Sequence, residues 1–111
     1  MAVNIKQLIA PSLVPNTEQT FYTCPASTST VFRALNLYNN TAGAVDVEFW
    51  IVPTGQSTGN DYLVAKKSVS GTSASRVTEV EGLVLQAGDF LVTKGTVNGG
   101  CSIIGGGVEV I

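Results

Sequence analysis

The sequence predicts an all-β fold, an antiparallel β-sandwich of jelly-roll-like or immunoglobulin-like type with an extended N-terminal arm. Short runs rich in Val, Ile, Thr, Phe and Tyr recur from residue 20 onward, and each is closed by Gly, Asn, Pro or Ser. These residue types favour strands and turns, respectively. No window of about ten residues carries the apolar stripe of a helix. Short strands with regular turns are typical of a sandwich or a barrel, and 111 residues suffice for one such domain.

Residues 1–19 are expected to form the arm and residues 20–111 the sandwich. Pro11 and Pro15 exclude a continuous helix and favour extended backbone around them. The apolar residues of this segment follow no clean period, although a short turn at 4–9 is compatible with them. We expect the arm either to pack across the domain or to reach a neighbouring subunit.

Turn chemistry divides the rest of the chain into strands. "NNTAG" at 39–43 predicts a hairpin, "PTGQSTGND" at 53–61 a longer loop, and "SGTS" at 70–73 and "QAGD" at 86–89 tight turns. "NGG" at 98–100 is the strongest turn signal, because Asn and Gly tolerate a positive φ. The strands expected around these turns lie near 20–24, 30–39, 44–52, 62–69, 75–81, 83–86, 89–95, 101–104 and 107–111.

Alternation along 44–52 predicts which face of that strand is buried, because successive side chains of a strand point to opposite faces. One set is wholly apolar and is expected in the core. The other begins with two carboxylates and ends with a large aromatic residue and a valine, which indicates a face that is wet at one end and covered at the other. The two sets are Val45, Val47, Phe49 and Ile51, and Asp46, Glu48, Trp50 and Val52.

The strand at 31–39 carries bulky side chains in both alternating sets. A strand that is apolar on both faces is usually buried on both. In a domain of this size, we expect the second cover to be another chain. The two sets are Val31, Arg33, Leu35 and Leu37, and Phe32, Ala34, Asn36 and Tyr38.

The C-terminal stretch is rich in glycine and poor in charge. Six of the twelve glycines lie within 95–111, where Glu109 is the only charged residue. "CSIIGGG" at 101–107 has neither Lys nor Pro, the residues that discourage pairing at the edge of a sheet. We therefore expect this strand to be covered, either by a neighbouring subunit or by the arm of the same chain.

The chain carries little charge. Charged residues make up 13% of it, against about 25% in an ordinary soluble protein. A surface of this kind is poorly protected from association, so we expect partners to cover much of it; the alternative is a monomer coated in hydroxyl groups. The net charge of −2 excludes a basic patch for nucleic acid or anionic lipid.

No apolar run reaches the roughly 20 residues of a membrane span, and the N-terminus does not resemble a signal peptide. Synthesis in a cytoplasm without export is expected.

Candidate chemistry is sparse, and we expect no enzymatic activity, no cofactor and no metal. Histidine is absent, which removes the commonest general base and the commonest transition-metal ligand. The paired carboxylates Asp46/Glu48 and Glu79/Glu81 could contribute to a calcium site, but nothing nearby supplies further ligands, and solvated strand faces are the favoured reading. Cys24 and Cys101 are expected to be buried or half-buried free thiols rather than a disulfide.

Aromatic residues allow one alternative. Tyr38, Trp50 and Tyr62 could form a sugar-stacking platform, as in a carbohydrate-binding module. Aromatic residues of this kind more often anchor a core or an interface.

Three segments carry a resemblance to a known group of proteins: "FRALNLYNNTAGAVDVEFWIVPTG" at 32–55, "EGLVLQAGDFLV" at 81–92 and "GGGVEVI" at 105–111. Their arrangement of strands and turns resembles the small β-sandwich structural proteins of tailed bacteriophage virions, which include capsid decoration (cement) proteins and related head or tail accessory subunits. The resemblance covers residues 20–111, and its motifs are strand and turn patterns rather than catalytic signatures.

The resemblance implies a non-enzymatic capsid decoration protein on the virion surface. Its partners would be the major capsid protein and copies of itself, with a trimer favoured, and assembly would take place in the host cytoplasm. Alternatives are a tail, head–tail or fibre subunit and a carbohydrate- or receptor-binding module. We expect removal of residues 2–12 to abolish capsid binding or oligomerisation while the sandwich stays folded. The expected interface residues are Val3, Ile5, Leu8, Ile9, Tyr38, Trp50, Ile103 and Ile104.

Overall fold

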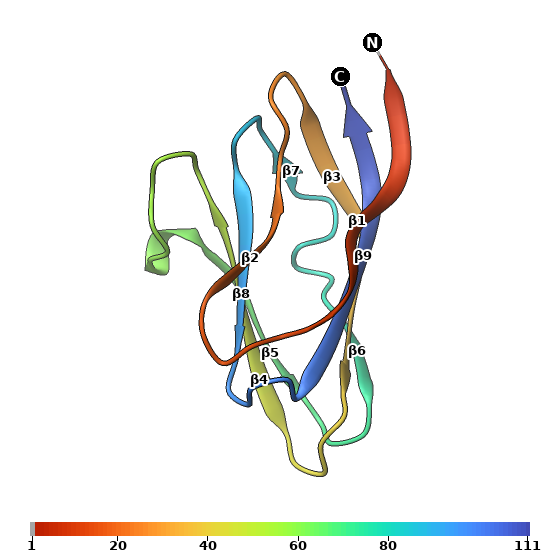
Figure 1. Cartoon of the computed structure of the whole chain (residues 1–111), viewed down its shortest axis with the longest axis vertical. Helices are drawn as coiled ribbons and strands as arrows, with labels where there is room; N and C mark the ends of the chain where they lie inside the picture. Colours follow the sequence, from red (N-terminus) through yellow and green to blue (C-terminus); the bar gives the residue numbers. More distant parts are fainter. Residues whose placement is uncertain (1) are drawn as a thin grey trace.

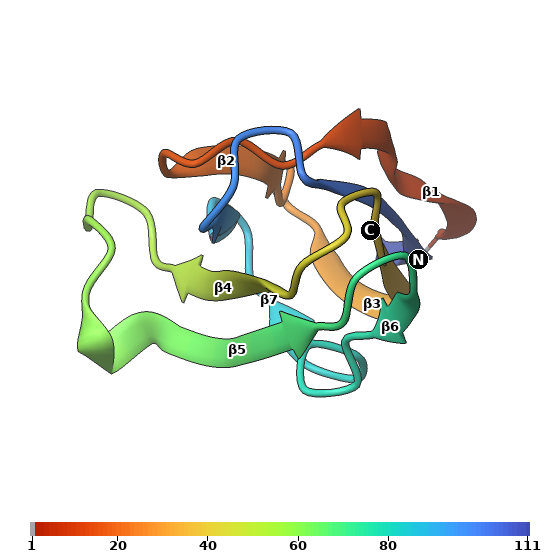
Figure 2. The ribbon, with the colours of Figure 1, turned by 90° about the horizontal axis from the view of Figure 1, so that it is seen from below.

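The computed structural model describes residues 2–111, and these form two antiparallel sheets packed face to face (Figures 1 and 2). The predicted fold class is confirmed. Sheet A has the order β1-β9-β3-β6, with β7 also paired to β3. Its strands are β1 (Val3–Leu13), β3 (Ser29–Asn39), β6 (Ala74–Arg76), β7 (Val84–Leu85) and β9 (Cys101–Val110).

Sheet B has the order β2-β8-β4-β5. The chain crosses between the sheets at most connections, so neighbouring strands in each sheet are usually distant in sequence, as in a jelly roll. A short 3-10 turn, η1 (Asn60–Tyr62), lies in the loop after β4. The strands of sheet B are β2 (Gln19–Thr23), β4 (Val45–Val52), β5 (Leu63–Val69) and β8 (Phe90–Gly95).

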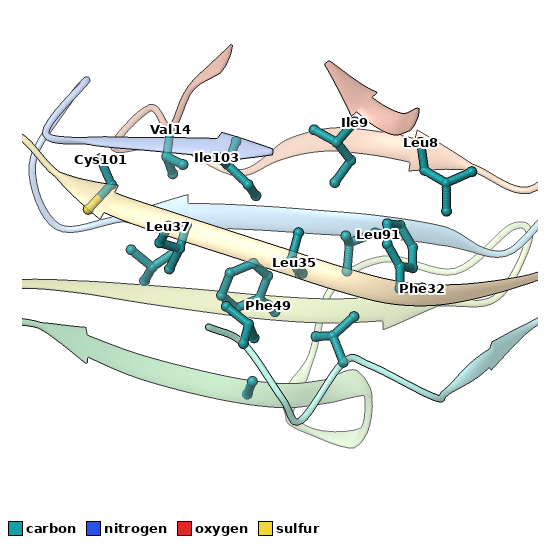
Figure 3. Close-up of a cluster of buried hydrophobic side chains, with 14 of the residues drawn as sticks. Leu8, Ile9, Val14, Phe32, Leu35, Leu37, Phe49, Leu91, Cys101 and Ile103 are labelled. Carbon is teal, nitrogen blue, oxygen red and sulfur yellow. The ribbon is translucent and has the colours of Figure 1, made fainter. Parts of the chain in front are cut away.

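The core lies between the two sheets and draws large apolar side chains from both (Figure 3). Phe32 packs edge-on against Tyr22, with ring centroids 5.5 Å apart. Burying each such side chain stabilises the fold by about 1.5–3 kcal/mol. The largest fully buried side chains are Phe32, Phe49, Leu35, Leu37, Leu85, Leu91 and Ile103.

The N-terminal segment is extended, but it is an edge strand of sheet A rather than a free arm. β1 pairs with β9 from Val3 to Leu13, so no turn forms at 4–9. Backbone hydrogen bonds between Ala2 and Ile111, of 3.2 and 2.8 Å, hold the two ends of the chain side by side (Figure 1). Of the two expected places for the arm, the structure shows the first, across its own domain. The cover of β9 is therefore supplied by the same chain.

β9 runs without a break through the three glycines, where the sequence analysis expected two strands. Gly107 lies where the backbone of β3 approaches closely, since a Cβ there would come 2.2 Å from the Val31 carbonyl oxygen. Gly105 faces the core, where a Cβ would meet Leu35 at 3.0 Å. The glycines thus let a central strand lie close to the neighbouring backbone and core side chains.

A bulge in β3 corrects the expectation that this strand is buried on both faces. Phe32 lies opposite Gly107 and Ala34 lies opposite Gly106, which leaves Arg33 as an extra residue. The bulge shifts the alternation by one residue, so Phe32 and Leu35 both reach the core. The other face of β3 is open, and Tyr38 on it is 43% exposed.

The outer face of β4 changes along the strand from partly solvent-exposed to buried, as expected. Asp46 and Glu48 are half-buried at one end of the strand. At the other end, Trp50 and Val52 are buried with Val92 in a small second cluster. The partly buried residues packed against this cluster are Tyr62, Leu63 and Phe90.

The strand expected at 75–81 ends at Arg76. The chain then turns, and Val77 and Val80 are both fully buried within this non-strand segment. Glu81 fixes the turn, because its carboxylate accepts hydrogen bonds from the Leu35 N–H (3.1 Å) and from the Arg76 guanidinium (2.7 and 2.9 Å).

Candidate interaction surface on sheet A

The outer face of sheet A carries a row of aliphatic side chains that crosses four strands. The register places Ile5 of β1 opposite Val108 of β9, Val108 opposite Val31 of β3, and Val31 opposite Val84 of β7. Directly opposed residues in antiparallel strands point to the same face. Ile5 is 87% exposed and Val84 53% exposed, so both ends of the row lie open to solvent.

Two shallow hollows lie beside this row on the same face. One, of about 330 Å³, is lined by residues of β1, β3 and β9, among them the three glycines of β9. The other, of about 300 Å³, extends toward Pro11, Tyr38 and Ala74. Asn36 and Ile104 border both hollows, which makes the surface one continuous, mainly apolar area.

We call this surface the A-face. Charged side chains at its borders are partly neutralised. The Arg76 guanidinium lies 2.7 Å from a Glu81 oxygen, and the Lys6 ammonium lies 3.2 Å from a Glu109 oxygen. Arg33 stands exposed at the bulge of β3. The A-face consists of Val3, Ile5, Val31, Ala34, Asn36, Tyr38, Val84, Ile104, Gly106 and Val108.

The outer face of sheet B has the opposite character. Glu48 of β4 lies opposite Lys66 of β5 on one side and Lys94 of β8 on the other. Cross-strand pairs of opposite charge suit a solvated face. The apolar residues of that face, around Trp50, are already buried within the chain. The two outer faces therefore differ, and the A-face is the one that remains apolar and uncovered.

The eight expected interface residues separate into two groups. Four lie on the A-face with substantial exposure: Val3 (59%), Ile5 (87%), Tyr38 (43%) and Ile104 (40%). The structure buries the other four within the chain, which corrects the expectation that they are available to a partner. Leu8, Ile9 and Ile103 lie in the core between the sheets (Figure 3), and Trp50 lies in the second cluster on sheet B.

Two features explain the buried group. A register shift between Gln7 and Ile9 lets the consecutive residues Leu8 and Ile9 both be buried. In β9, the Ile103 side chain points into the core, whereas the side chain of its neighbour Ile104 points outward. Because the N-terminal segment has no clear periodicity, its sequence could not show which of these residues are buried and which are exposed.

Most of the aliphatic row was not predicted from the sequence. Val31, Val84 and Val108 come from three strands that are remote in the chain, and their alignment depends on the register of β9 and β3. The only signal in the sequence was the bulk on both faces of the strand at 31–39.

A partly buried chain of polar side chains runs from the surface at Lys6 into the interior near the chain ends. The Lys6 ammonium donates to Glu109, and the Tyr22 hydroxyl donates to the other Glu109 oxygen. The same hydroxyl lies 2.7 Å from the Thr30 hydroxyl, which lies 3.2 Å from the Cys24 thiol. Burial, and then the hydrogen bond with Glu109, raise the pKa of Tyr22 above its ordinary value. These contacts tie β1, β9 and β3 to β2.

The remaining chemical candidates are dispersed. Cys24 and Cys101 are buried free thiols, as expected, and burial raises the pKa of Cys101. Within residues 2–111, no group of three or more His, Cys, Asp or Glu side chains is placed to hold a metal ion. Glu79 instead pairs with Lys67 at 3.3 Å. No helix in the described part of the chain has the length and apolarity needed to span a membrane.

The three aromatic residues considered for sugar stacking do not form one platform. Tyr38 lies on the outer face of sheet A, whereas Trp50 and Tyr62 pack together on sheet B. Trp50 is only 7% exposed, so its ring is not free to stack on a ligand.

No protein-family model and no curated protein matches this chain. Among solved structures, it is similar to a chain from the structure described as Bacillus endospore appendages, a family of disulfide-linked pili. The TM-score is 0.55 and the identity 14%, over 96% of this chain and 86% of that chain. A chain of the infectious bursal disease virus Gt strain structure gives a TM-score of 0.46 at 11% identity, over 97% of this chain but 32% of the viral one. At these identities, what the pilus chain and this protein share is the β-sandwich fold.

Proposed function

We propose that this protein is a non-enzymatic structural subunit of a protein assembly and that the A-face is its docking surface. The observation that carries the proposal is the exposed aliphatic row from Ile5 to Val84 on a chain with few charges. Contiguous apolar patches on soluble proteins mark interaction sites. The fold shared with a pilus subunit is compatible with such a role.

The specific assembly that we propose is a bacteriophage capsid, with this protein as a decoration subunit. The resemblance of residues 20–111 to phage decoration proteins supports this choice. The A-face would cover seams between major capsid subunits, and each 100 Å² of apolar surface removed from water would contribute about 2.5 kcal/mol. Many copies on a lattice would resist expansion together. A trimer, expected from the same resemblance, is the proposed unit on the capsid surface.

A filament subunit is the second candidate, favoured by the similarity to the pilus chain. Electron microscopy of the purified protein would separate the two roles. Filaments formed by this chain alone would favour the second role, whereas binding to empty expanded capsids of the same virus would favour the first. The tail, head–tail and fibre roles are tested by binding to the corresponding virion parts.

The test of the docking surface uses two matched charge substitutions. Ile104→Lys places an ammonium group at the centre of the A-face, between the two hollows. Ser68→Lys places one on an exposed position of sheet B, opposite Asp46. We expect Ile104→Lys to weaken capsid binding by at least about tenfold, because a buried unpaired charge is costly, and Ser68→Lys to bind normally. Normal binding by a folded Ile104→Lys variant would refute the A-face as the docking surface.

A further inference from the structure

The free edge of β1 differs from the other sheet edges of the molecule. β1 is an edge strand of sheet A, and its first half pairs with β9 without interruption from Val3 to Gln7. The opposite edge of sheet A is made of the short strands β6 and β7. In sheet B, the edge strand β2 is short and contains a register shift, and β5 carries two adjacent lysines, which discourage pairing.

The hydrogen bonds of β1 show which of its backbone groups are free. Ala2 and Ile111 exchange two backbone hydrogen bonds, so they form a hydrogen-bonded pair. Hydrogen-bonded and non-hydrogen-bonded pairs alternate along an antiparallel ladder. Because the register from Val3↔Val110 to Gln7↔Gly106 has no shift, Asn4 and Lys6 point their N–H and C=O groups toward β9. Those of Val3, Ile5 and Gln7 point away from β9, toward the free edge.

Nothing in this short segment protects the free edge. The Lys6 ammonium, which would normally oppose edge pairing, is held 3.2 Å from Glu109, a residue that is only 6% exposed. Pro11 and both register shifts of β1 lie beyond Gln7. Residues 3–7 are therefore a regular, exposed strand edge, and two of its residues, Val3 and Ile5, belong to the A-face.

We propose that this edge binds the same edge of a second copy, antiparallel, about a two-fold axis at Ile5. Ile5 then lies opposite the partner's Ile5, and Val3 lies opposite the partner's Gln7. This register joins only residues whose groups face the free edge. Each copy contributes three residues with one N–H and one C=O each, so the contact satisfies all of them with six hydrogen bonds.

Neighbouring registers are less favourable. An axis at Lys6 would place Val3 opposite the partner's Ile9, which lies beyond the first register shift of β1, so the regular pairing would be lost there. An axis at Asn4 would pair Val3 with the partner's Ile5 and leave the Gln7 groups of both copies without an opposing residue in the described segment. The axis at Ile5 also joins the aliphatic rows of the two copies, since Ile5 is the end of each row.

The contact does not depend on the proposed capsid role, because its hydrogen bonds come from the backbone edge of β1, although Val3 and Ile5 also lie on the A-face. A two-fold contact does not close a trimer. If the protein forms trimers on a lattice, the edge contact would join copies that belong to neighbouring trimers.

Amide hydrogen exchange of the untagged protein tests the pairing residue by residue. At low concentration, we expect slow exchange for Asn4 and Lys6 and fast exchange for Val3, Ile5 and Gln7. At a concentration where sedimentation shows dimers, exchange of these three amides should slow by about tenfold or more. A chain that stays monomeric at millimolar concentration, or an oligomer in which these three amides still exchange fast, would overturn the proposal.

A proline substitution supplies the second test. Ile5→Pro removes an N–H that faces the free edge and leaves the ladder to β9 intact, a position where strands tolerate proline. We expect this variant to remain folded and to lose dimerisation, while Ile5→Thr, which keeps the N–H, retains it. Ile104→Lys should also retain it. Dimerisation of a folded Ile5→Pro variant at the wild-type concentration would contradict the proposal, and amide exchange of the wild type decides the matter if the variant does not fold.

Discussion

The phenol of Tyr22 in β2 donates a hydrogen bond to the Glu109 carboxylate in β9 and thereby joins the two sheets through the interior. Glu109 is nearly buried, and the Lys6 ammonium binds its other oxygen at 3.2 Å. A buried carboxylate is stable only when it is paired and hydrogen-bonded. The Glu109 carboxylate therefore links β9 both to β2, through Tyr22, and to the edge strand β1, through Lys6.

Replacing Tyr22 with Phe is expected to lower the free energy of unfolding by about 1–3 kcal/mol, because it leaves a buried carboxylate oxygen without its donor. Urea denaturation at neutral pH measures the loss. Tyr38→Phe is the matched control: its hydroxyl lies on the exposed A-face, and we expect a change within about 0.5 kcal/mol. Equal stabilities of the two variants would contradict the structural role of the Tyr22 hydroxyl.

The same residue predicts a dependence of stability on alkaline pH. The pKa of Tyr22 is raised in the folded state, mainly by burial and then by its bond to Glu109, above an ordinary value of 10.0. The folded protein therefore keeps a proton that the unfolded chain loses. The stabilisation is complete below pH 10 and decreases as the pH rises above it, by at most about 1.4 kcal/mol per pH unit. The difference in unfolding free energy between wild type and Tyr22→Phe should shrink above pH 10, and a constant difference would contradict this.

Replacing two neighbouring glycines of β9 with alanine should affect the stability of the protein differently. A Cβ at Gly107 would lie 2.2 Å from the Val31 carbonyl oxygen and 2.9 Å from Leu8, so Gly107→Ala must displace β3. We expect a loss of about 1–3 kcal/mol or more in unfolding free energy. At Gly106 the nearest atom is the Lys6 carbonyl oxygen at 3.6 Å, an ordinary contact, so Gly106→Ala should fold normally. Thermal denaturation of both variants checks the contrast.

The sequence predicted the fold class, the turns and most strand positions, because each depends on local composition. It could not place the bulge of β3 or the shift of β1 after Gln7, which decide which residues of these two strands are buried. One extra residue at Arg33 exchanges the faces of β3 beyond it, and the shift after Gln7 turns Leu8 and Ile9 inward together. Both irregularities accommodate pairing with β9, which lies about a hundred residues from β1 along the chain. The alternation of apolar and polar residues within one strand does not show how that strand aligns with a partner strand far away in the sequence.

The candidate surface was predictable only in part for the same reason. Ile5 and Ile104 could be singled out as apolar residues in segments that needed cover, but their shared face depends on the pairing of β1 and β3 with β9. Val77 and Val80 show a different error, a strand that was predicted where the chain forms a turn. The β-branched residues between 75 and 81 favoured a strand, whereas hydrogen bonds to the Glu81 carboxylate hold the segment in a turn.

Deletion of residues 2–12 should destabilise the whole domain. The sequence alone predicts a folded sandwich after this deletion. In the structure, however, the segment supplies the core residues Leu8 and Ile9 and covers one edge of β9. Losing two buried aliphatic side chains alone would cost several kcal/mol, a large share of a typical domain's stability. We expect aggregation or a lost unfolding transition in circular dichroism, and a cooperative transition near the wild-type midpoint would contradict this.

Glu81 predicts the behaviour of the protein in acid. The Arg76 guanidinium, by its hydrogen bond, holds the pKa of Glu81 below the ordinary value of 4.5, and the Leu35 N–H contributes in the same direction. The stabilisation from this carboxylate is therefore present above pH 4.5 and is lost as the pH falls through the lowered pKa. Glu81→Gln should be less stable than wild type at pH 7 and should approach it in acid. Glu48→Gln, the same change on the solvated face of sheet B, controls for loss of charge. A constant difference between Glu81→Gln and wild type from pH 7 to strong acid would show that the Arg76 contact contributes no pH-dependent stability.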